Sequence, residues 1–349
     1  MSFAPPDLAT LSTAGFDTVI DVRSPSEFAE DHVPGAINLP VLDDEERARV
    51  GTIYVQQSAF LARKLGAALV ARNAATHIEG PLARHDGGWQ PLVYCWRGGQ
   101  RSNSFASILS QIGWRVEVLQ GGYQSYRRLV KDALYDRPFP CRVVLLDGFT
   151  GTAKTDLLHV AARRGAQVID LEGLANHRGS LFGAMGAQPA QKGFESALAE
   201  RVRTLDPNRP VLVEAESSKV GERVVPPSLW KAMQAAPRVT VEAPVAARAG
   251  YLARAYADIV ADPERLDATL VSLTRLQGRE RVEQWRLMAR EGQVEALAGE
   301  LMTHHYDPRY AKQAGRHETP DAGTLRAERL DAAEIESLGA ELAARLSRI

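Results

Sequence analysis

The sequence predicts an α/β fold in two domains, with a mainly helical C-terminal region. Short apolar runs alternate with amphipathic helical stretches up to residue 134, and the same alternation begins again at residue 142. A proline-marked stretch, residues 135–141, separates the two series. We therefore assign residues 1–134 to a first α/β domain, residues 135–141 to a linker, and residues 142–349 to a second α/β domain with a helical extension.

The strands of the first domain are short and apolar. They are expected at residues 18–22, within 33–40, at 91–94 and at 114–119. The run at 91–94 stops directly at Cys95, and the run at 114–119 is closed by Gly121 and Gly122. Apolar runs of this length, bounded by turns, are typical of buried strands.

Helical patterns connect these strands. Ser24 is the expected N-cap of one helix, because Pro25 occupies the first helical position and Glu27 the position that completes a capping box. Residues 43–72 are mostly helical in pattern, and residues 102–112 form an amphipathic helix. This strand–loop–helix alternation describes an α/β domain.

The second domain repeats the alternation. Its strands are expected at residues 142–147, 167–171, 210–214 and 238–242. A loop at 148–154 leads from the first of these strands into a helix at 155–164. From about Val245 onward the pattern is mainly helical, and residues 331–349 form an amphipathic helix with one apolar face.

The composition is that of a globular protein without a strong charge preference. The 349 residues are 45% hydrophobic and 24% charged, and 42 Lys and Arg against 43 Asp and Glu leave a net charge of −1. This balance argues against a protein held to nucleic acid by charge alone, but it permits a local basic surface. We expect no signal peptide, and we find no apolar run long enough to span a membrane. Two cysteines without zinc-site spacing indicate a reducing compartment and predict a cytoplasmic protein.

The first informative loop is Cys95-Trp96-Arg97-Gly98-Gly99-Gln100-Arg101, which follows a predicted strand and precedes a helix. A Gly-rich loop can turn backbone N–H groups inward, and the helix N-terminus adds partial positive charge. Both favour a thiolate, and Arg97 and Arg101 add full charges. The same loop would hold an oxyanion such as the phosphate of a donor. We predict that Cys95 is reactive, because a structural cysteine would leave the glycines and arginines unexplained.

The second informative loop is Gly148-Phe149-Thr150-Gly151-Thr152-Ala153-Lys154-Thr155. It fits the phosphate-binding pattern GxxxxGK[ST], except that Ala153 replaces the second glycine. Two phosphates would be cradled by the backbone and side chains of Gly148, Thr150, Gly151, Thr152, Lys154 and Thr155, with Thr155 as the usual magnesium ligand. Ala153 puts a methyl group at the bend, which could weaken binding, and the alternative is a degenerate loop kept for folding. Glu214 or Glu216, at the end of a strand, could supply the accompanying acid.

Both loops lie in sequences that resemble known families. Residues 21–28 and 32–38 resemble the entry region of rhodanese domains, and the loop at Cys95 looks like their active site, with a Cys-to-Arg spacing one residue longer than usual. In that family Asp21, Arg23 and Glu27 are more often structural than catalytic. A rhodanese-like domain followed by a P-loop NTPase-like domain resembles the tRNA 2-selenouridine synthase family. Segments 50–54, 176–183 and 306–310 are similar to motifs of that family.

The resemblance implies a two-step transferase that acts on the wobble 2-thiouridine of tRNA. The sulfur is first alkylated with a geranyl group from geranyl diphosphate, and the geranylthio group is then replaced with selenium from selenophosphate. Cys95 would carry selenium as a perselenide or guide its delivery, and Lys154 would stabilise the diphosphate leaving group. Tightly bound cofactors are not implied, apart from magnesium as a candidate. The implied partners are tRNA and the enzyme that supplies selenophosphate, without a membrane.

Other residues are candidates for substrate contact. His177, Arg178 and Ser180 lie in a loop after a predicted strand, where a satisfied loop histidine is the alternative for His177. The helical region offers arginines for tRNA, although acids alternate with some of them. These are Arg248, Arg254, Arg265, Arg275, Arg279, Arg281, Arg286 and Arg290.

Two further functions stay open on sequence grounds. The first is a sulfurtransferase fused to an ATP-dependent kinase-like domain, which would turn over ATP. The second is a non-catalytic module that binds phosphorylated partners, which would keep its activity after Cys95→Ser.

Overall fold

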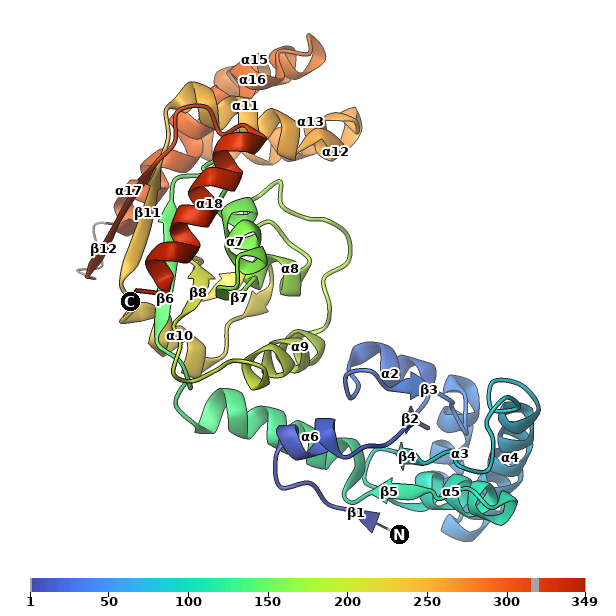
Figure 1. Cartoon of the computed structure of the whole chain (residues 1–349). Helices are drawn as coiled ribbons and strands as arrows, with labels where there is room; N and C mark the ends of the chain where they lie inside the picture. The colour runs from blue at the N-terminus through green and yellow to red at the C-terminus, as the bar shows by residue number, and fades with distance from the viewer. Residues whose placement is uncertain (1, 315–319, 349) are drawn as a thin grey trace. The chain divides into compact units, whose positions relative to one another are not determined.

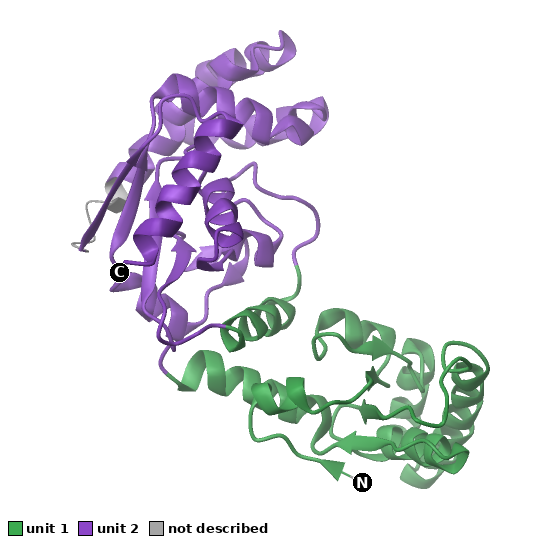
Figure 2. Cartoon of the chain, viewed as in Figure 1, with its two compact units in different colours: residues 1–137, 189–204 green, residues 138–188, 205–349 purple. Residues whose placement is uncertain are grey.

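The computed structural model describes residues 2–314 and 320–348, and the chain divides into two compact units. Unit 1 contains residues 1–137 and 189–204, and unit 2 contains residues 138–188 and 205–349 (Figure 2). The segment 189–204 therefore clusters with unit 1, although it lies within the part of the sequence assigned to the second domain. Each unit has a parallel sheet with helices, so the predicted α/β class is confirmed for both.

Unit 1 is built on a five-stranded sheet in the order β1-β5-β4-β2-β3, in which every neighbouring pair is parallel. The strands are β1 (Ser2–Phe3), β2 (Thr18–Asp21), β3 (Ile37–Asn38), β4 (Pro91–Tyr94) and β5 (Glu117–Leu119) (Figure 1). The central strand β4 is buried along its whole length, which explains its unbroken apolar sequence. Asp21 pairs with Tyr94 in register, so the ends of β2 and β4 lie side by side next to Cys95.

Helices connect and cover this sheet. They are α1 (Leu8–Thr13), α2 (Pro25–Glu30), α3 (Asp44–Gln56), α4 (Ala59–Glu79), α5 (Gln100–Ile112), α6 (Gly122–Lys131), which continues as a π-helical turn at Asp132–Asp136, and α9 (Gln191–Arg203). The capping box of Ser24 and Glu27 at the start of α2 is confirmed.

Helix α9 is held to the rest of unit 1 by buried polar contacts. Arg127 of α6 forms an ion pair with Glu195, and Ser196 donates to the Asp31 carboxylate at 3.0 Å. The Tyr135 hydroxyl donates to the other oxygen of Glu195 at 2.7 Å. Glu195, Ser196 and Asp31 are all buried, so removing one partner would leave an unpaired polar group inside the unit.

Unit 2 contains a second five-stranded parallel sheet, in the order β12-β11-β6-β8-β7. Its strands are β6 (Val143–Gly148), β7 (Gln167–Ile169), β8 (Val211–Glu214), β11 (Arg238–Glu242) and β12 (Asp321–Arg326). A small antiparallel pair, β9 (Lys219–Val220) and β10 (Arg223–Val224), lies outside this sheet. The pattern after residue 245 predicted mainly helices and gave no sign of β12, which pairs with β11 at the edge of the sheet.

The helices of unit 2 are α7 (Lys154–Arg163), α8 (Leu171–Ala175), α10 (Pro227–Gln234), α11 (Val245–Ala255), α12 (Ala257–Val260), α13 (Pro263–Ser272), α14 (Thr274–Gln277), α15 (Arg279–Arg290), α16 (Val294–Leu301) with a π-helical turn at Met302–Tyr306, α17 (Asp307–Ala314) and α18 (Ala332–Leu346). Helices α11 to α16 gather at one end of the unit (Figure 1). Among residues 2–314 and 320–348, every helix is too short or too polar to cross a lipid bilayer.

Helix α18 packs along α7, the helix that follows the phosphate-binding loop (Figure 1). Gly339 makes this close approach possible, because a Cβ at that position would lie 2.4 Å from two atoms of the Val160 side chain. Leu338, Leu342 and Leu346 are buried in the same core as Leu157. The apolar face predicted for the last helix therefore covers the element that carries Lys154.

Candidate functional site

The thiol of Cys95 lies directly after β4, under the turn that leads into α5. The residue is 3% exposed. The Gly99 N–H donates to its Sγ at 3.3 Å, and the Ser102 hydroxyl lies 3.2 Å from Sγ. Gly98 has a φ of 64°, and a Cβ there would lie 2.7 Å from the Leu119 carbonyl oxygen. Gly98 is thus required by the turn itself.

The surroundings of Cys95 favour its thiolate. Burial raises the pKa of the thiol, but the Ser102 hydroxyl, the N–H groups of Ser102 and Gly99 and the charge of Arg101 outweigh burial, so the pKa falls below its ordinary value. For the other cysteine, Cys141, burial and the nearby Asp206 raise the pKa. The two cysteines therefore differ in the sense expected if only Cys95 is reactive.

Replacing Ser102 with alanine is expected to raise the pKa of Cys95 by roughly one unit, because a hydrogen bond to a charged group contributes about 1.5–3 kcal/mol. The rate of alkylation by iodoacetamide should then reach half of its plateau at a higher pH. The measurement is a pH–rate profile in a Cys141→Ser background, so that Cys95 is the thiol observed. Ser104→Ala, an exposed serine on the same helix, is the matched control. An unchanged midpoint in Ser102→Ala would contradict the assignment.

The remaining residues of the loop have different environments. Trp96 packs on the ring of Tyr123, with ring centroids 5.3 Å apart. Arg97 and Gln100 are exposed, whereas Arg101 forms an ion pair with Glu27 at 3.0 Å. The two arginines predicted at this loop therefore differ: Arg101 is partly compensated by a carboxylate, and Arg97 extends to the surface.

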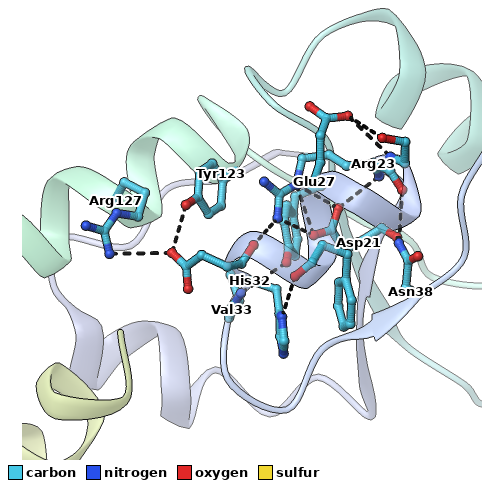
Figure 3. A network of polar contacts seen from close by, with 12 residues as sticks. Asp21, Arg23, Glu27, His32, Val33, Asn38, Tyr123 and Arg127 are labelled. Atoms are coloured by element: carbon cyan, nitrogen blue, oxygen red, sulfur yellow. Dashed lines mark hydrogen bonds and ion pairs between the residues drawn. The ribbon is translucent and has the colours of Figure 1, made fainter. Parts of the chain in front are cut away.

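A buried network beneath the loop supports the structural interpretation of Asp21 and Arg23. The Arg23 guanidinium donates to Asp21 at 2.6 Å and to the Asp31 carbonyl at 2.6 Å, and it lies 3.8 Å from the centroid of the Tyr123 ring. Figure 3 shows Arg23 between Asp21 and Tyr123, with the Tyr123 hydroxyl directed away toward a second acid. That acid is Asp31, which accepts the Tyr123 hydroxyl at 2.7 Å. Both charges of the Asp21–Arg23 pair are buried, so the pair holds α2 and β2 in place.

The phosphate-binding loop of unit 2 runs from the end of β6 to the start of α7. Gly148 has a φ of 149°, and a Cβ there would lie 2.6 Å from the Val241 carbonyl oxygen. Ala153 has φ 57° and ψ 30°, the left-handed conformation that favours glycine. The loop therefore bends at residue 153 as a glycine-containing loop would, with a methyl group at the bend.

Replacing Ala153 with glycine is expected to stabilise unit 2 by about 0.5–1 kcal/mol, because an L-residue in this conformation costs about 1–2 kcal/mol and the extra freedom of glycine in the unfolded chain offsets part of the gain. Hydrogen exchange of the amides in β6 and α7 would measure the change. The matched control is Ala162→Gly inside α7, which should destabilise by about 1 kcal/mol. Equal losses in the two variants would contradict this account of Ala153.

Lys154 and its neighbours hold the loop in shape. The Lys154 ammonium donates to the carbonyl oxygens of Gly148 at 2.8 Å and Phe149 at 3.4 Å. Behind the loop, the Tyr310 hydroxyl contacts Asp147 and accepts from the Gly148 N–H at 3.0 Å. The late motif at residues 306–310 thus braces the loop.

Arg248 is a second brace rather than a surface cation. It is 3% exposed and donates to the Thr150 carbonyl at 3.1 Å. It also forms an ion pair with Asp307 at 2.7 Å and lies 5.2 Å from the ring centroid of Phe149. The expectation that Arg248 contacts tRNA is therefore wrong, because its guanidinium is buried against the loop.

Other predicted arginines are also held by intramolecular contacts. Arg286 pairs with Asp267 at 2.6 Å and Glu283 at 2.8 Å, and Arg254 donates to the Leu330 carbonyl at 2.9 Å. Four arginines of the predicted set are exposed: Arg254, Arg275, Arg279 and Arg290.

Two carboxylates contact the Thr155 hydroxyl, and Glu216 lies next to them. Thr155 Oγ1 lies 2.6 Å from Glu214 Oε1 and 3.1 Å from Glu172 Oε2. Burial raises the pKa of Glu172, Glu214 and Glu216, and the repulsion among them raises it further. Glu214 was a candidate from its place at a strand end, but Glu172 was missed. Glu172 follows β7 and Glu214 ends β8, and these two strands are parallel neighbours. Their carboxyl ends therefore meet at one edge of the sheet, and this placement was the signal that could have identified Glu172.

A polar pocket opens over this loop. Its lining includes Lys154, Thr155, Glu172, Glu214 and Glu216. Arg178 and Ser180 also line it, and Arg178 is held by Asp258 at 2.9 Å and stacks on Tyr256. His177 is not among its lining residues. The His177 Nδ1 accepts from the Gly179 N–H at 3.1 Å, and burial lowers the pKa of the ring. The structure therefore brings two of the three predicted contact residues to the loop.

An apolar cavity adjoins the polar pocket. It lies among the helices that gather at one end of unit 2, where the sequence analysis predicted no cavity. The residues are Thr150, Ser180, Phe182, Leu252, Ala253, Tyr256, Ile259, Val260, Leu266, Ala289, Val294, Leu297, Ala298, Leu301, Met302 and Tyr306. Thr150, Ser180, Leu252, Tyr256 and Tyr306 line both spaces. A pocket lined by charged side chains and a hydrocarbon-lined space are therefore contiguous.

Comparison with known proteins accounts for most of the chain. Residues 4–129 match the family described as a rhodanese-like domain, and residues 141–329 match the tRNA 2-selenouridine synthase AAA domain. The tRNA 2-selenouridine synthase of Pseudomonas putida GB-1 is 35% identical over 329 residues, covering 84% of this chain and 87% of the relative. That of Pseudomonas entomophila L48 is 34% identical, covering 90% and 93%. That of Hahella chejuensis is 40% identical over 246 residues, covering 68% and 63%.

Proposed function

This chain belongs to the tRNA 2-selenouridine synthase family of enzymes, and from that membership we propose that it modifies tRNA in two steps. In the first step, unit 2 transfers a geranyl group from geranyl diphosphate to the sulfur of wobble 2-thiouridine. In the second step, selenium from selenophosphate replaces the geranylthio group, and Cys95 of unit 1 guides the delivery of selenium. A selenophosphate-producing enzyme would be the supplier.

The observation that carries this proposal is the contiguity of the polar pocket and the apolar cavity. A nucleotide would need polar partners for its ribose and base beyond the phosphates. The side chains beyond the shared mouth are instead hydrocarbon, from Phe182 to Met302. A diphosphate ester with a hydrocarbon tail matches both spaces, with its charged end at Lys154. This favours the geranyl donor over the kinase-like alternative.

In the proposed first step, the thiocarbonyl sulfur attacks C1 of the geranyl group and the C1–O bond breaks. Diphosphate leaves, and the nucleoside loses its N3 proton to solvent, which keeps it neutral. The negative charge that develops on the bridging oxygen would be stabilised by Lys154 and by backbone N–H groups of the loop. The loop is already braced by Tyr310, which accepts from the Gly148 N–H, and by Arg248, which donates to the Thr150 carbonyl.

The residues around Thr155 fit a magnesium ion. Glu214 is buried, and its Oε2 has no hydrogen-bond partner among the described residues. Within residues 2–314 and 320–348, no cluster of three His, Cys, Asp or Glu side chains is arranged to hold a metal alone. This suits Mg²⁺, which commonly takes one or two protein oxygens and completes its shell with phosphate and water. Thr155 and Glu214 would hold the ion, which would neutralise charge on the diphosphate.

In the proposed second step, the selenium of selenophosphate forms a bond to C2 of the nucleoside. The C2–S bond breaks, geranylthiolate leaves and takes a proton, and water cleaves the Se–P bond to release phosphate. An S-alkylated sulfur leaves far more readily than a thiocarbonyl, which explains the order of the steps. The turn at Gly98 and Gly99 would hold the donor's oxygens beside the Cys95 thiolate.

The test is mass spectrometry of wobble nucleosides after the protein is incubated with 2-thiouridine-containing tRNA, geranyl diphosphate and selenophosphate. Omitting selenophosphate should yield S-geranyl-2-thiouridine, and the complete mixture should yield 2-selenouridine. Unchanged 2-thiouridine in every mixture would contradict the proposal. A parallel assay should detect no ATP turnover, with or without tRNA, whereas turnover stimulated by tRNA would favour the kinase-like function.

A further inference from the structure

The apolar cavity has two neighbours, and it shares a different set of lining residues with each. It shares its mouth with the polar pocket of the phosphate-binding loop. It also borders a more open depression, whose remaining lining residues are Ala257, Ala261, Gly292, Gln293, Glu295 and Ala296. The cavity therefore adjoins both the polar pocket and a depression in the surface.

Three side chains line both the apolar cavity and the open depression: Ala253, Val260 and Val294. They come from α11, α12 and α16, and all three are half-buried, as expected for residues that face a cavity on one side and solvent on the other. We call these three residues the partition. None of these three residues lines the polar pocket, so the partition lies away from the place proposed for the phosphates.

We propose that the partition sets the greatest length of hydrocarbon chain that unit 2 accepts on its diphosphate substrate. This inference rests on the proposed function, since it needs a hydrocarbon tail in the cavity. A tail that enters at Tyr256 and Tyr306 runs between the helices until it meets Ala253, Val260 and Val294. Its first carbons are fixed by the phosphate site, so its last carbons reach a depth set by the number of bonds.

The energetic reason is that a hydrocarbon tail gains affinity only from the methylenes that it buries. Each buried methylene is expected to contribute about fourfold in affinity, which is the usual transfer free energy expressed as a ratio. A tail longer than the cavity has to displace the partition or leave its end in water. Small side chains in the partition would let a longer tail pass toward the depression, and a large side chain would stop a shorter one.

The experiment compares dimethylallyl, geranyl and farnesyl diphosphates as donors to 2-thiouridine-containing tRNA, with inorganic pyrophosphate as a competitor that reports the phosphate site alone. Val294→Phe is expected to lower kcat/KM for geranyl diphosphate at least about tenfold while dimethylallyl diphosphate and the affinity for pyrophosphate stay unchanged. Val294→Ala and Val260→Ala are expected to raise kcat/KM for farnesyl diphosphate by a similar factor. Ala296→Phe, in the depression but outside the cavity, is the matched control and should leave the preference as in the original protein.

The outcomes separate this inference from the proposed function. If the original protein transfers geranyl groups but all partition variants keep its chain-length preference, the partition has no such role. If no ester in the series binds the original protein more tightly than pyrophosphate, both the tail site and the proposed function are wrong. Retained pyrophosphate affinity shows that a variant is folded, and the two alanine variants test the same partition without adding bulk.

Discussion

Replacing Lys154 with alanine is expected to lower the rate of geranyl transfer by about 10²–10³-fold, the range observed when one preorganised donor to a developing negative charge is removed. The Lys154 ammonium lies across the loop at 2.8 Å from the Gly148 carbonyl oxygen, at the centre of the cradle for the leaving diphosphate. Its contribution is greatest when the C1–O bond breaks, so kcat should fall more than KM rises. Single-turnover transfer to 2-thiouridine-containing tRNA measures the change.

The controls for Lys154→Ala come from the same helix and from the other unit. Arg163→Ala removes an exposed cation of α7 that pairs with Glu336, and it should leave transfer unchanged. Incorporation of selenium into tRNA that already carries the S-geranyl group should also be unchanged in Lys154→Ala, because we propose unit 1 for that step. A folded Lys154→Ala protein that transfers geranyl groups at the original rate would refute the role assigned to the loop.

The second large effect is expected for Cys95→Ser. Selenium incorporation should fall at least about 10³-fold, as when a reactive group is removed from an active site, while geranyl transfer continues. S-geranyl-2-thiouridine should then accumulate, which distinguishes this variant from one with a general folding defect. Quantitative nucleoside analysis after a single incubation reports both values.

Cys141→Ser is the matched control, because it makes the same change at a buried thiol in unit 2 whose pKa is raised rather than lowered. It should keep both steps. If Cys95→Ser forms 2-selenouridine as fast as the original protein, the thiol has no part in the second step, and the non-catalytic interpretation of unit 1 gains support.

The two loops could be predicted from the sequence because each is contiguous. A strand, a glycine-containing turn and a helix follow one another within a few residues, and the chemistry resides in that segment. The same holds for the capping box at Ser24 and Glu27. Ala153 also shows what a sequence pattern alone cannot predict. The sequence reveals a departure from the pattern, but only the backbone angles show that the departure keeps the bend.

Features assembled from distant segments could not be predicted. Helix α9 clusters with unit 1 through Glu195 and Ser196, and no local pattern names Arg127 or Asp31 as their partners. In strand β12 apolar and polar residues alternate only weakly, and the strand pairs with β11, which lies far earlier in the chain. The apolar cavity arises where the faces of several helices meet, so each helix alone predicts only an ordinary core.

The packing of α18 on α7 has a consequence for the order in which the protein matures on the ribosome. Domains generally fold as they emerge, N-terminal parts first. Unit 1 has all its segments once residue 204 has been made. The helix that carries Lys154, in contrast, lacks its covering neighbour until residues 332–346 have been made, and the sheet edge lacks β12 until residue 326. A nascent chain is therefore expected to complete the surroundings of Cys95 before those of Lys154, and a chain truncated before α18 would lack the helix that covers α7.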